Sequence, residues 1–353
     1  MLVRRDGAGQ PCSDDGGNTG VRCRPSTGKP KVVVVSGGTD GMGRAVALAR
    51  ARLGDEVVVL GSNLEKGRRL VAEAEQAGAP GRVHVVRADL SSIAENRRVI
   101  REIAARHERV DALCLFANRQ SPQRVVTPEG LERTFALYYV SRYVLGHGLA
   151  PLLARSASPV IVNVAGVGTT AGGIRWDDLR LERSYSTVAA QLQAGRANDL
   201  LGVAFAARPD NPVRYVLYHP GFTRSGDLTP LPWAARVALR TAAALAARPV
   251  ADAVAPVLEL IDDPPTAALT AIDRGRRLPL TLRTLDPADA DRLATVTRAL
   301  VAAAEGSGHE ADSPGDGSGA ADTAPDVPDT TAHARWLGGQ LGEITAPGST
   351  PAP

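Results

Sequence analysis

A glycine-rich turn between a run of valines and a helical pattern constrains the fold of this chain more than any other feature. Four valines precede Ser36-Gly37-Gly38-Thr39-Asp40-Gly41-Met42-Gly43, and the helical pattern starts at Arg44. Glycines here permit a tight turn, close approach of the backbone to a pyrophosphate, and close packing of the helix on the strand. The free N–H groups at the helix N-terminus favour phosphate. We therefore predict a nucleotide-binding turn, in preference to a glycine turn without a ligand. The expected binding residues are Ser36, Gly37, Gly38, Asp40, Gly41, Met42, Gly43 and Arg44.

Strand and helix patterns alternate along the chain after this turn. The expected strands are Val32–Ser36, Glu56–Leu60, Val83–Arg87, Ala112–Phe116, Val160–Val164 and Val213–Tyr218, with Thr266–Ile272 as a candidate final strand. The expected helices are Arg44–Leu53, Leu64–Ala77, Ile93–Arg106, Gly130–Leu153 and Thr187–Ala206. Near-continuous apolar strands separated by helices are typical of a parallel sheet covered on both faces. The sequence thus predicts an α/β protein with a doubly wound parallel sheet, a Rossmann fold, whose ligand crevice lies at the carboxyl ends of the strands.

Composition divides the chain into one domain and two tails. Residues 1–30 and 304–353 are rich in glycine, proline and small polar residues, which predicts a disordered leader and a disordered tail around a single domain at 31–303. The leader has no secretory pattern, and no apolar run is long enough to span a membrane.

Charge and cysteine content narrow the function classes. A net charge of +3 and 4% aromatic residues argue against a nucleic-acid partner. The three cysteines lack metal-ligand spacing, so we expect no metal site and no structural disulfide. The expected location is the cytoplasm.

The residues after the second expected strand favour NADP(H) over NAD(H). An acidic side chain that would bind the ribose 2′-hydroxyl of NAD is missing there, and Ser62 and Asn63 follow the strand. Together with Arg44, Ser62 suits a 2′-phosphate. Lys66 and Arg68 fit the same role or a solvated helix face equally well.

Asp89, after the third strand, has two possible roles. Its carboxylate either accepts a hydrogen bond from the adenine amino group or caps the next helix, a task that Ser91 or Ser92 can share. Both interpretations can hold together.

Several segments together resemble the short-chain dehydrogenase/reductase superfamily, most closely its retinol-dehydrogenase-like and oxidoreductase-like members. They are Ser36–Gly43, Asp89-Leu90, Asp111–Asn118, Thr127–Ala136 and His219-Pro220-Gly221, and the resemblance covers residues 31–300. It implies an NAD(P)(H)-binding domain, usually in a homodimer or homotetramer, that reduces carbonyls or oxidises alcohols. It also adds Leu90, Asn118, Pro220 and Gly221, with Asp89, to the expected cofactor site.

The catalytic positions of the family are all replaced in this chain. The family uses a Tyr to protonate the carbonyl oxygen, a Lys to lower the pKa of that Tyr, a Ser to orient the substrate and an Asn to hold a water. Here the corresponding positions hold Gln191, Gly195, Gly166 and Tyr138, and the chain contains no Tyr-x-x-x-Lys pair.

Three other side chains are candidates for the roles of the missing catalytic residues. Tyr138 is a candidate proton donor with Arg142 to tune it, Gln191 a candidate hydrogen-bond donor to a carbonyl, and Tyr185 a residue that can fold inward. Simple packing explains Tyr138, Tyr139 and Tyr143 better than any one of these roles. Gly195, inside an expected helix, predicts a close backbone contact with cofactor ribose or a partner helix.

Two functions follow from this sequence. The first is an NADP(H)-dependent oxidoreductase with a non-standard proton donor and a small, apolar substrate, for which Asp227–Val250 would form an apolar lid. The alternative is a catalytically silent NADP(H)-binding protein of the same fold that acts as a sensor, scaffold or partner subunit.

Overall fold

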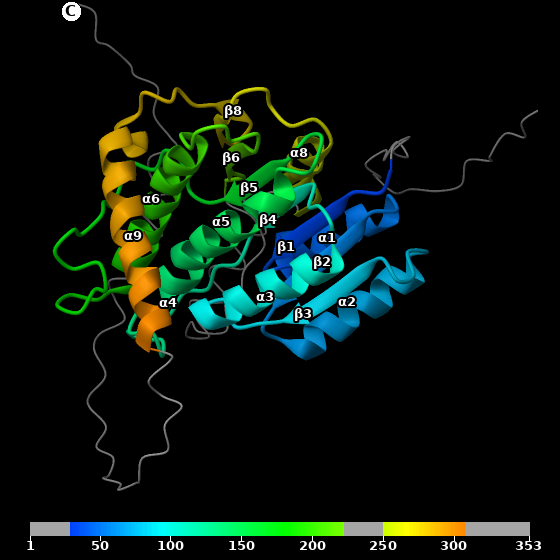
Figure 1. Ribbon diagram of the computed structural model, residues 1–353, viewed down its shortest axis with the longest axis horizontal. Helices are drawn as coiled ribbons and strands as arrows, with labels where there is room; N and C mark the ends of the chain where they lie inside the picture. The colour runs from blue at the N-terminus through cyan, green and yellow to red at the C-terminus, as the bar shows by residue number, and fades with distance from the viewer. Residues whose placement is uncertain (1–28, 222–249, 308–353) are drawn as a thin grey trace, which may run out of the picture.

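The computed structural model describes residues 29–221 and 250–307, in which the strands form one eight-stranded sheet (Figure 1). The strand order is β3-β2-β1-β4-β5-β6-β7-β8, with parallel pairing throughout except for the antiparallel β7–β8 pair. The strands are β1 Val32–Ser36, β2 Glu56–Gly61, β3 Val83–Arg87, β4 Ala112–Leu115, β5 Val160–Val164, β6 Arg214–His219, β7 Leu269–Asp273 and β8 Arg276–Arg277. The prediction of a doubly wound parallel sheet is confirmed.

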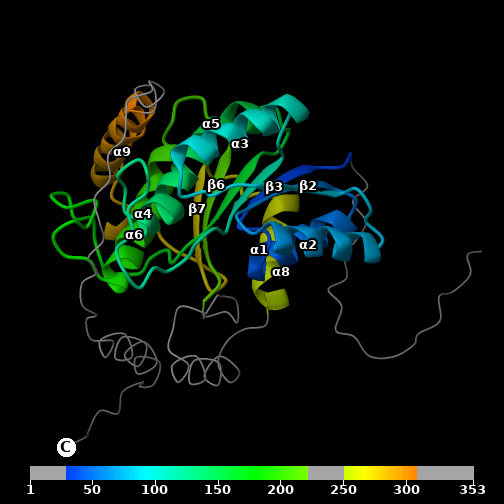
Figure 2. The same ribbon diagram turned by 90° about the horizontal axis from the view of Figure 1, so that it is seen from below.

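Helices cover both faces of this sheet (Figure 2). One face carries α1 Gly41–Arg52, α2 Leu64–Gln76 and α8 Val250–Asp262. The opposite face carries α3 Ile93–Arg106, α5 Ser141–Leu153 and α6 Thr187–Ala206, and α9 Pro287–Ser307 packs against α6. The candidate site lies on this second side, where α6 passes the carboxyl end of β5.

Alternation along β1 explains why the sheet needs helices on both faces. Val33 and Val35 are fully buried with the α1 and α8 side chains, whereas Val32 and Val34 are buried with those of α3 and α5. A strand with apolar side chains on both sides is stable only between two layers. The four-valine run is the sequence signature of that position.

The structure differs from the sequence prediction at the helix expected over Gly130–Leu153. The helix begins only after Glu132, because the carboxylate of Glu132 accepts hydrogen bonds from the amides of Thr134 and Phe135, both at 2.8 Å. A short α4, Arg133–Phe135, then leads into a π-helical turn, η1 Ala136–Val140, before α5 starts. π-Helical turns are rare and often occur at functional sites.

The sequence patterns did not predict α8, β8 or α9. The buried side chains described for α9 are few, namely Ala290, Leu293, Thr297 and Val301, so its apolar stripe is weak. α9 extends to Ser307, past the domain end expected at 303. Most of both expected tails and nearly all of the expected lid at 227–250 lie outside the described residues.

Candidate active site

The glycine turn lies at the carboxyl end of β1, where it folds closely against its neighbours. Gly37 has φ +68°, and a Cβ there would lie 2.7 Å from the amide nitrogen of Ala117. A Cβ on Gly43 would lie 2.5 Å from the carbonyl oxygen of Gly37. Asp40 caps α1 by accepting a hydrogen bond from the Gly41 amide at 2.8 Å. The glycines thus bring the backbone to the sheet edge, and the first-turn N–H groups of α1, which have no acceptor within the helix, suit a pyrophosphate.

The basic residues expected beside a 2′-phosphate are held in ion pairs. The Arg44 guanidinium pairs with Glu73 of α2, and the Lys66 ammonium pairs with Asp40. Ser62 is exposed directly after β2. A 2′-phosphate at this edge would therefore compete with the carboxylates of Glu73 and Asp40.

Asp89 stabilises the turn after β3. Its Oδ1 accepts hydrogen bonds from the Ser91 amide at 3.0 Å and the Ser91 hydroxyl at 2.7 Å, while Ser92 caps α3 through the Glu95 amide. Of the capping residues considered, Ser92 is thus the cap, and Asp89 orders the turn before it. Leu90 is buried in the core beside this turn.

The turn after β6 also lies at the carboxyl edge of the sheet. His219 Nδ1 and Asp273 Oδ1 are 2.8 Å apart, and Gly221 has φ +84°. Pro220 and Gly221 are the last described residues of this turn, so their expected contact with nicotinamide stays a prediction.

A cavity of about 100 Å³ brings together the four residues that sequence reasoning predicts at catalytic positions. Tyr138, Gly166, Gln191 and Gly195 all line it. Counting along the sequence placed these residues at equivalent family positions, and the structure places them around one space. They come from the π-helical turn, the loop after β5 and two successive turns of α6.

The side chain of Gln191 is already hydrogen-bonded to that of Asn118. Its side-chain amide exchanges two hydrogen bonds with that of Asn118, which follows β4, and both N···O distances are 3.1 Å. The residues expected for cofactor binding and for carbonyl polarisation therefore contact each other. A substrate or cofactor that used either amide would have to open this pair.

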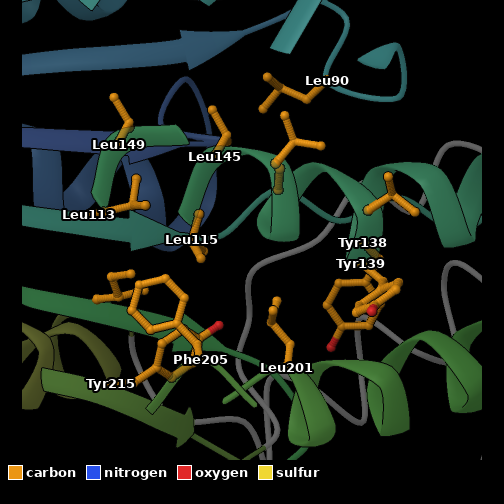
Figure 3. Packing of buried hydrophobic residues seen from close by; sticks show 14 of the residues in the cluster. Leu90, Leu113, Leu115, Tyr138, Tyr139, Leu145, Leu149, Leu201, Phe205 and Tyr215 are labelled. Carbon is orange, nitrogen blue, oxygen red and sulfur yellow. The ribbon is translucent and has the colours of Figure 1, made fainter. Parts of the chain in front are cut away.

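Tyr138 and Tyr139 are adjacent in the π-helical turn but have different surroundings. Both point from this turn toward the helix that carries Leu201 (Figure 3). The Tyr139 hydroxyl bonds Thr297 Oγ1 of α9 at 2.7 Å, so Tyr139 is a packing residue. Tyr138 instead lines the cavity.

Burial raises the pKa of Tyr138, although the Arg142 charge and a hydrogen bond from the Gly166 backbone act in the opposite direction. The Arg142 guanidinium carbon lies 4.6 Å from the centroid of the Tyr138 ring, as expected for a cation–π contact. At neutral pH Tyr138 is therefore a neutral phenol. It is therefore better suited to donate a hydrogen bond than to transfer its proton.

Arg142 is fully buried beneath this tyrosine. Its Nη1 donates to the Val164 carbonyl at 2.9 Å and to the side chain of Asn163, and its Nη2 donates to the Ala117 carbonyl at 3.0 Å. The guanidinium thus links the carboxyl ends of β4 and β5. Burial lowers its pKa to about 10, which still leaves it charged at neutral pH.

Asp199 is the cavity residue that sequence reasoning missed. It lies two helical turns after Gln191 on the same face of α6, and its side chain is 1% exposed. Burial raises its pKa to about 7. A signal was present in the sequence, since Asp199 is the one acidic residue of α6.

Two other residues make no contact of the expected kind among the described residues. A Cβ on Gly195 would meet no described atom within 4 Å, so a close contact with cofactor ribose or a partner helix stays a prediction. Tyr185 donates to the Ser121 carbonyl at 2.5 Å and takes no part in the cavity wall.

Comparison with known proteins identifies the family. The sequence model described as short chain dehydrogenase matches residues 31–177. A candidate daunorubicin C-13 ketoreductase, DnrU of Streptomyces sp. strain C5, is 31% identical over 204 residues, which cover 57% of this chain and 69% of the relative. The chain belongs to the short-chain dehydrogenase family.

Other short-chain dehydrogenases match over smaller shares of their length. Mouse retinol dehydrogenase 13 is 29% identical over 197 residues, 55% of this chain and 59% of the relative. Human polyprenol dehydrogenase is 28% identical over 168 residues, 46% of this chain and 51% of the relative. The chain therefore spans about half to two thirds of the length of these relatives.

Solved structures of short-chain dehydrogenases share the fold. One from Shigella flexneri 2a strain 301, solved with NADP, has a TM-score of 0.55 at 19% identity and covers 72% of this chain and 100% of its own. A metagenomic member in complex with NADP has a TM-score of 0.51 at 21% identity and covers 69% of this chain and 95% of its own. These likenesses show that the chain shares the fold of solved short-chain dehydrogenases.

No helix of residues 29–221 and 250–307 is both long and apolar enough to cross a membrane.

Proposed function

We propose that this short-chain dehydrogenase is an NADP(H)-dependent oxidoreductase that interconverts a carbonyl and an alcohol in the cavity beside α6. The observation that carries the proposal is the convergence of Tyr138, Gly166, Gln191 and Gly195 on that cavity. In this proposal, the site keeps the position of the family's catalytic site but has a different residue at each of the four catalytic positions. Reduced nicotinamide supplies the hydride when it is bound.

The cofactor site of the proposal lies along the carboxyl edge of the sheet. It consists of the glycine turn with α1, the turn after β3, the start of the loop after β4 and the turn after β6. The residues are Ser36, Gly37, Gly38, Asp40, Gly41, Met42, Gly43, Arg44, Ser62, Asp89, Leu90, Asn118, Pro220 and Gly221. Preference for NADP(H) rests on Ser62 and Arg44, which suit a 2′-phosphate once Arg44 leaves Glu73.

Tyr138 and Gln191 would stabilise the substrate oxygen. Tyr138 is a buried neutral phenol on the cavity wall, suited to donate a hydrogen bond to the charge that develops on a carbonyl oxygen. The Gln191 amide can donate a second hydrogen bond when the pair with Asn118 opens. The cavity also holds Ala171, Val188 and Leu192, which favours a small, apolar substrate.

The proposal includes a homodimer or homotetramer in the cytoplasm, as the family resemblance implies. Light scattering after size-exclusion chromatography would measure the subunit number directly. A monomer at micromolar concentration would contradict this part alone.

The central test has two stages. Titration with NADPH and NADH, followed by nicotinamide fluorescence and thermal shift, measures cofactor binding, and we expect NADPH to bind more tightly. Single-turnover oxidation of NADPH against a panel of ketones and aldehydes then measures chemistry.

Each stage has an outcome that contradicts part of the proposal. No response to either nucleotide would contradict both the oxidoreductase and the silent nucleotide-binding alternative. Binding without turnover of any carbonyl would favour the silent sensor, scaffold or partner subunit. Tighter binding of NADH would contradict the roles given to Ser62 and Arg44.

A further inference from the structure

The cavity contains a buried carboxyl group with an unsatisfied oxygen. Asp199 Oδ2 accepts one long hydrogen bond, from the Gly168 amide at 3.4 Å. Asp199 Oδ1 is buried and has no hydrogen-bond partner among the described residues. A buried polar atom left in this way is costly unless a proton, a water or a ligand satisfies it.

The surroundings of Asp199 have opposing effects on the pKa of its carboxyl group, so that both the protonated and the ionised form are accessible near neutral pH. Burial raises its pKa to about 7, while the Arg196 charge and the Gly168 amide act in the opposite direction. Arg196 Nη2 is itself held by the carbonyls of Thr169 at 2.9 Å and Gly172 at 3.3 Å. Tyr138 faces Asp199 from η1, and Asp289 of α9 acts on Arg196.

The glycine at position 195 opens the cavity above this carboxyl. Gln191, Gly195 and Asp199 follow one another at one-turn intervals along α6, and all three line the cavity. A Cβ on Gly195 would meet nothing described within 4 Å, so no side chain separates the cavity from the next turn of the helix. A substrate in the cavity can therefore reach Asp199, which a long side chain at 195 would cover.

We propose that Asp199 is the proton carrier of this site, giving a proton to the oxygen of a bound ketone or aldehyde and taking one from the corresponding alcohol. The inference rests on the proposed oxidoreductase function. It assigns to α6 a carboxylic acid in the role for which the family uses a tyrosine.

Reduction needs a hydride at the carbonyl carbon, which reduced nicotinamide supplies when it is bound. As the C=O π bond opens, its electron pair moves to oxygen, and that oxygen takes the proton from Asp199 while the O–H bond of the carboxyl breaks. The carboxylate that remains is stabilised by Arg196 and the Gly168 amide, and solvent water returns the proton. Tyr138 donates a hydrogen bond to the same substrate oxygen and keeps its own proton.

The test compares Asp199→Asn with Asp289→Asn. Both substitutions remove one carboxylate that acts on Arg196, but Asp289 is exposed on α9 and lies outside the cavity wall. We expect D199N to bind NADPH within about twofold of wild type and to lose at least about 100-fold in single-turnover carbonyl reduction, as for loss of a general acid. D289N should match wild type in both measurements.

A second readout does not depend on activity. Carbon-13 NMR of labelled aspartate carboxyls in the wild type should show one group titrating near pH 7, and that signal should be missing from D199N and present in D289N. Asp199→Glu keeps a carboxyl at the cavity and should retain part of the turnover that D199N loses, which separates loss of the acid from a general disturbance of α6.

The outcomes separate the two proposals. Turnover of D199N within about threefold of wild type, or titration of the Asp199 carboxyl near pH 4, would overturn the role of Asp199 while the oxidoreductase proposal stands. A wild type that binds NADPH but reduces no carbonyl would overturn both. Equal loss of turnover in D199N, D199E and D289N would also overturn the assignment, because a carboxyl at 199 would then make no difference.

Discussion

Adjacent tyrosines in one π-helical turn illustrate how strongly surroundings decide the role of a residue. Tyr138 lines the cavity, and Tyr139 bonds Thr297 in the core. The sequence shows only two neighbouring tyrosines, for which packing is the favoured interpretation and proton donation by Tyr138 the alternative. The wider π-helical turn separates them, and no apolar periodicity predicts such a turn.

This pair supplies a matched mutational test. Tyr138→Phe removes a hydrogen-bond donor from the substrate oxygen, so we expect turnover to fall by about 10- to 1,000-fold, on the scale of loss of one oxyanion donor. Tyr139→Phe removes the buried bond to Thr297 and should lower the free energy of unfolding by about 1 kcal/mol with turnover unchanged. Single-turnover rates and thermal unfolding of both variants measure the two effects. Unchanged turnover in Y138F would remove Tyr138 from the mechanism.

The Asp199 carboxyl also predicts how reaction rate depends on pH. Reduction needs the protonated acid, so its rate should be constant below pH about 7 and fall above it; alcohol oxidation needs the carboxylate and should rise through the same range. Measuring both directions across pH 5–9 at saturating cofactor checks the sign. Profiles that bend in the same direction would contradict a single shared proton carrier.

The same carboxyl predicts the effect of pH on stability. Its pKa rises from an ordinary 3.8 to about 7 on folding, so the folded state holds the proton more tightly. The contribution to stability is therefore complete below pH about 4 and is lost as pH rises to about 7, an effect of roughly 4 kcal/mol at 1.4 kcal/mol per pKa unit. Asp199→Asn removes this term, so denaturant unfolding should show the variant gaining stability relative to wild type from pH 5 to pH 8. A constant difference between the two proteins across that range would contradict the raised pKa.

At the scale of elements, helix spacing explains why much of the site could be predicted. Gln191 and Gly195 were placed by counting along one helix, and a helix keeps that spacing in three dimensions. Asp199 lies on the same face but was missed, because its burial depends on how α6 meets the loop after β5. The ion pair between Arg44 and Glu73 joins residues of α1 and α2 that are 29 positions apart, and single-sequence patterns do not contain such contacts.

The open face of α6 at Gly195 gives a paired prediction. Gly195→Ala adds a methyl group in free space within a helix, so we expect about 1 kcal/mol of added stability and an unchanged pH profile. Gly195→Lys places an ammonium within reach of Asp199, which should lower the pKa of that carboxyl and move the fall in reduction rate to lower pH. Carboxyl NMR and pH–rate profiles of both variants test this. An equal pKa of Asp199 in the two variants would show that position 195 does not face the carboxyl.

The contact between α1 and α2 predicts how cofactor preference can be changed. Glu73→Gln frees Arg44 for a 2′-phosphate, so the ratio of NADPH to NADH affinity should rise about two- to fivefold, the scale of a half-exposed ion pair. Glu75→Gln removes the same charge from an exposed position two residues further along α2 and serves as the control. Fluorescence titration of both variants with both nucleotides gives the ratio. An equal rise in E73Q and E75Q would reflect net charge alone and not release of Arg44.

At the scale of the whole molecule, the sheet explains which predictions succeeded. Six strands and a seventh candidate followed from short apolar runs, and their parallel order brings the turns after β1, β3, β4, β5 and β6 to one edge. The helices α8 and α9 pack against α1 and α6, which are far away in the sequence, and neither helix was predicted. Sheet topology was thus easier to predict than the outer helices.

Arg142 has a consequence for ligand affinity. Its guanidinium joins the strand ends beneath the cavity through bonds made entirely within the protein, at Ala117, Asn163 and Val164. The conformational entropy of these strand ends is therefore lost when the chain folds, before any ligand binds. Ligand binding therefore carries no further entropy cost for ordering these strand ends. The few contacts that a small ligand makes in this cavity can then contribute fully to its binding free energy.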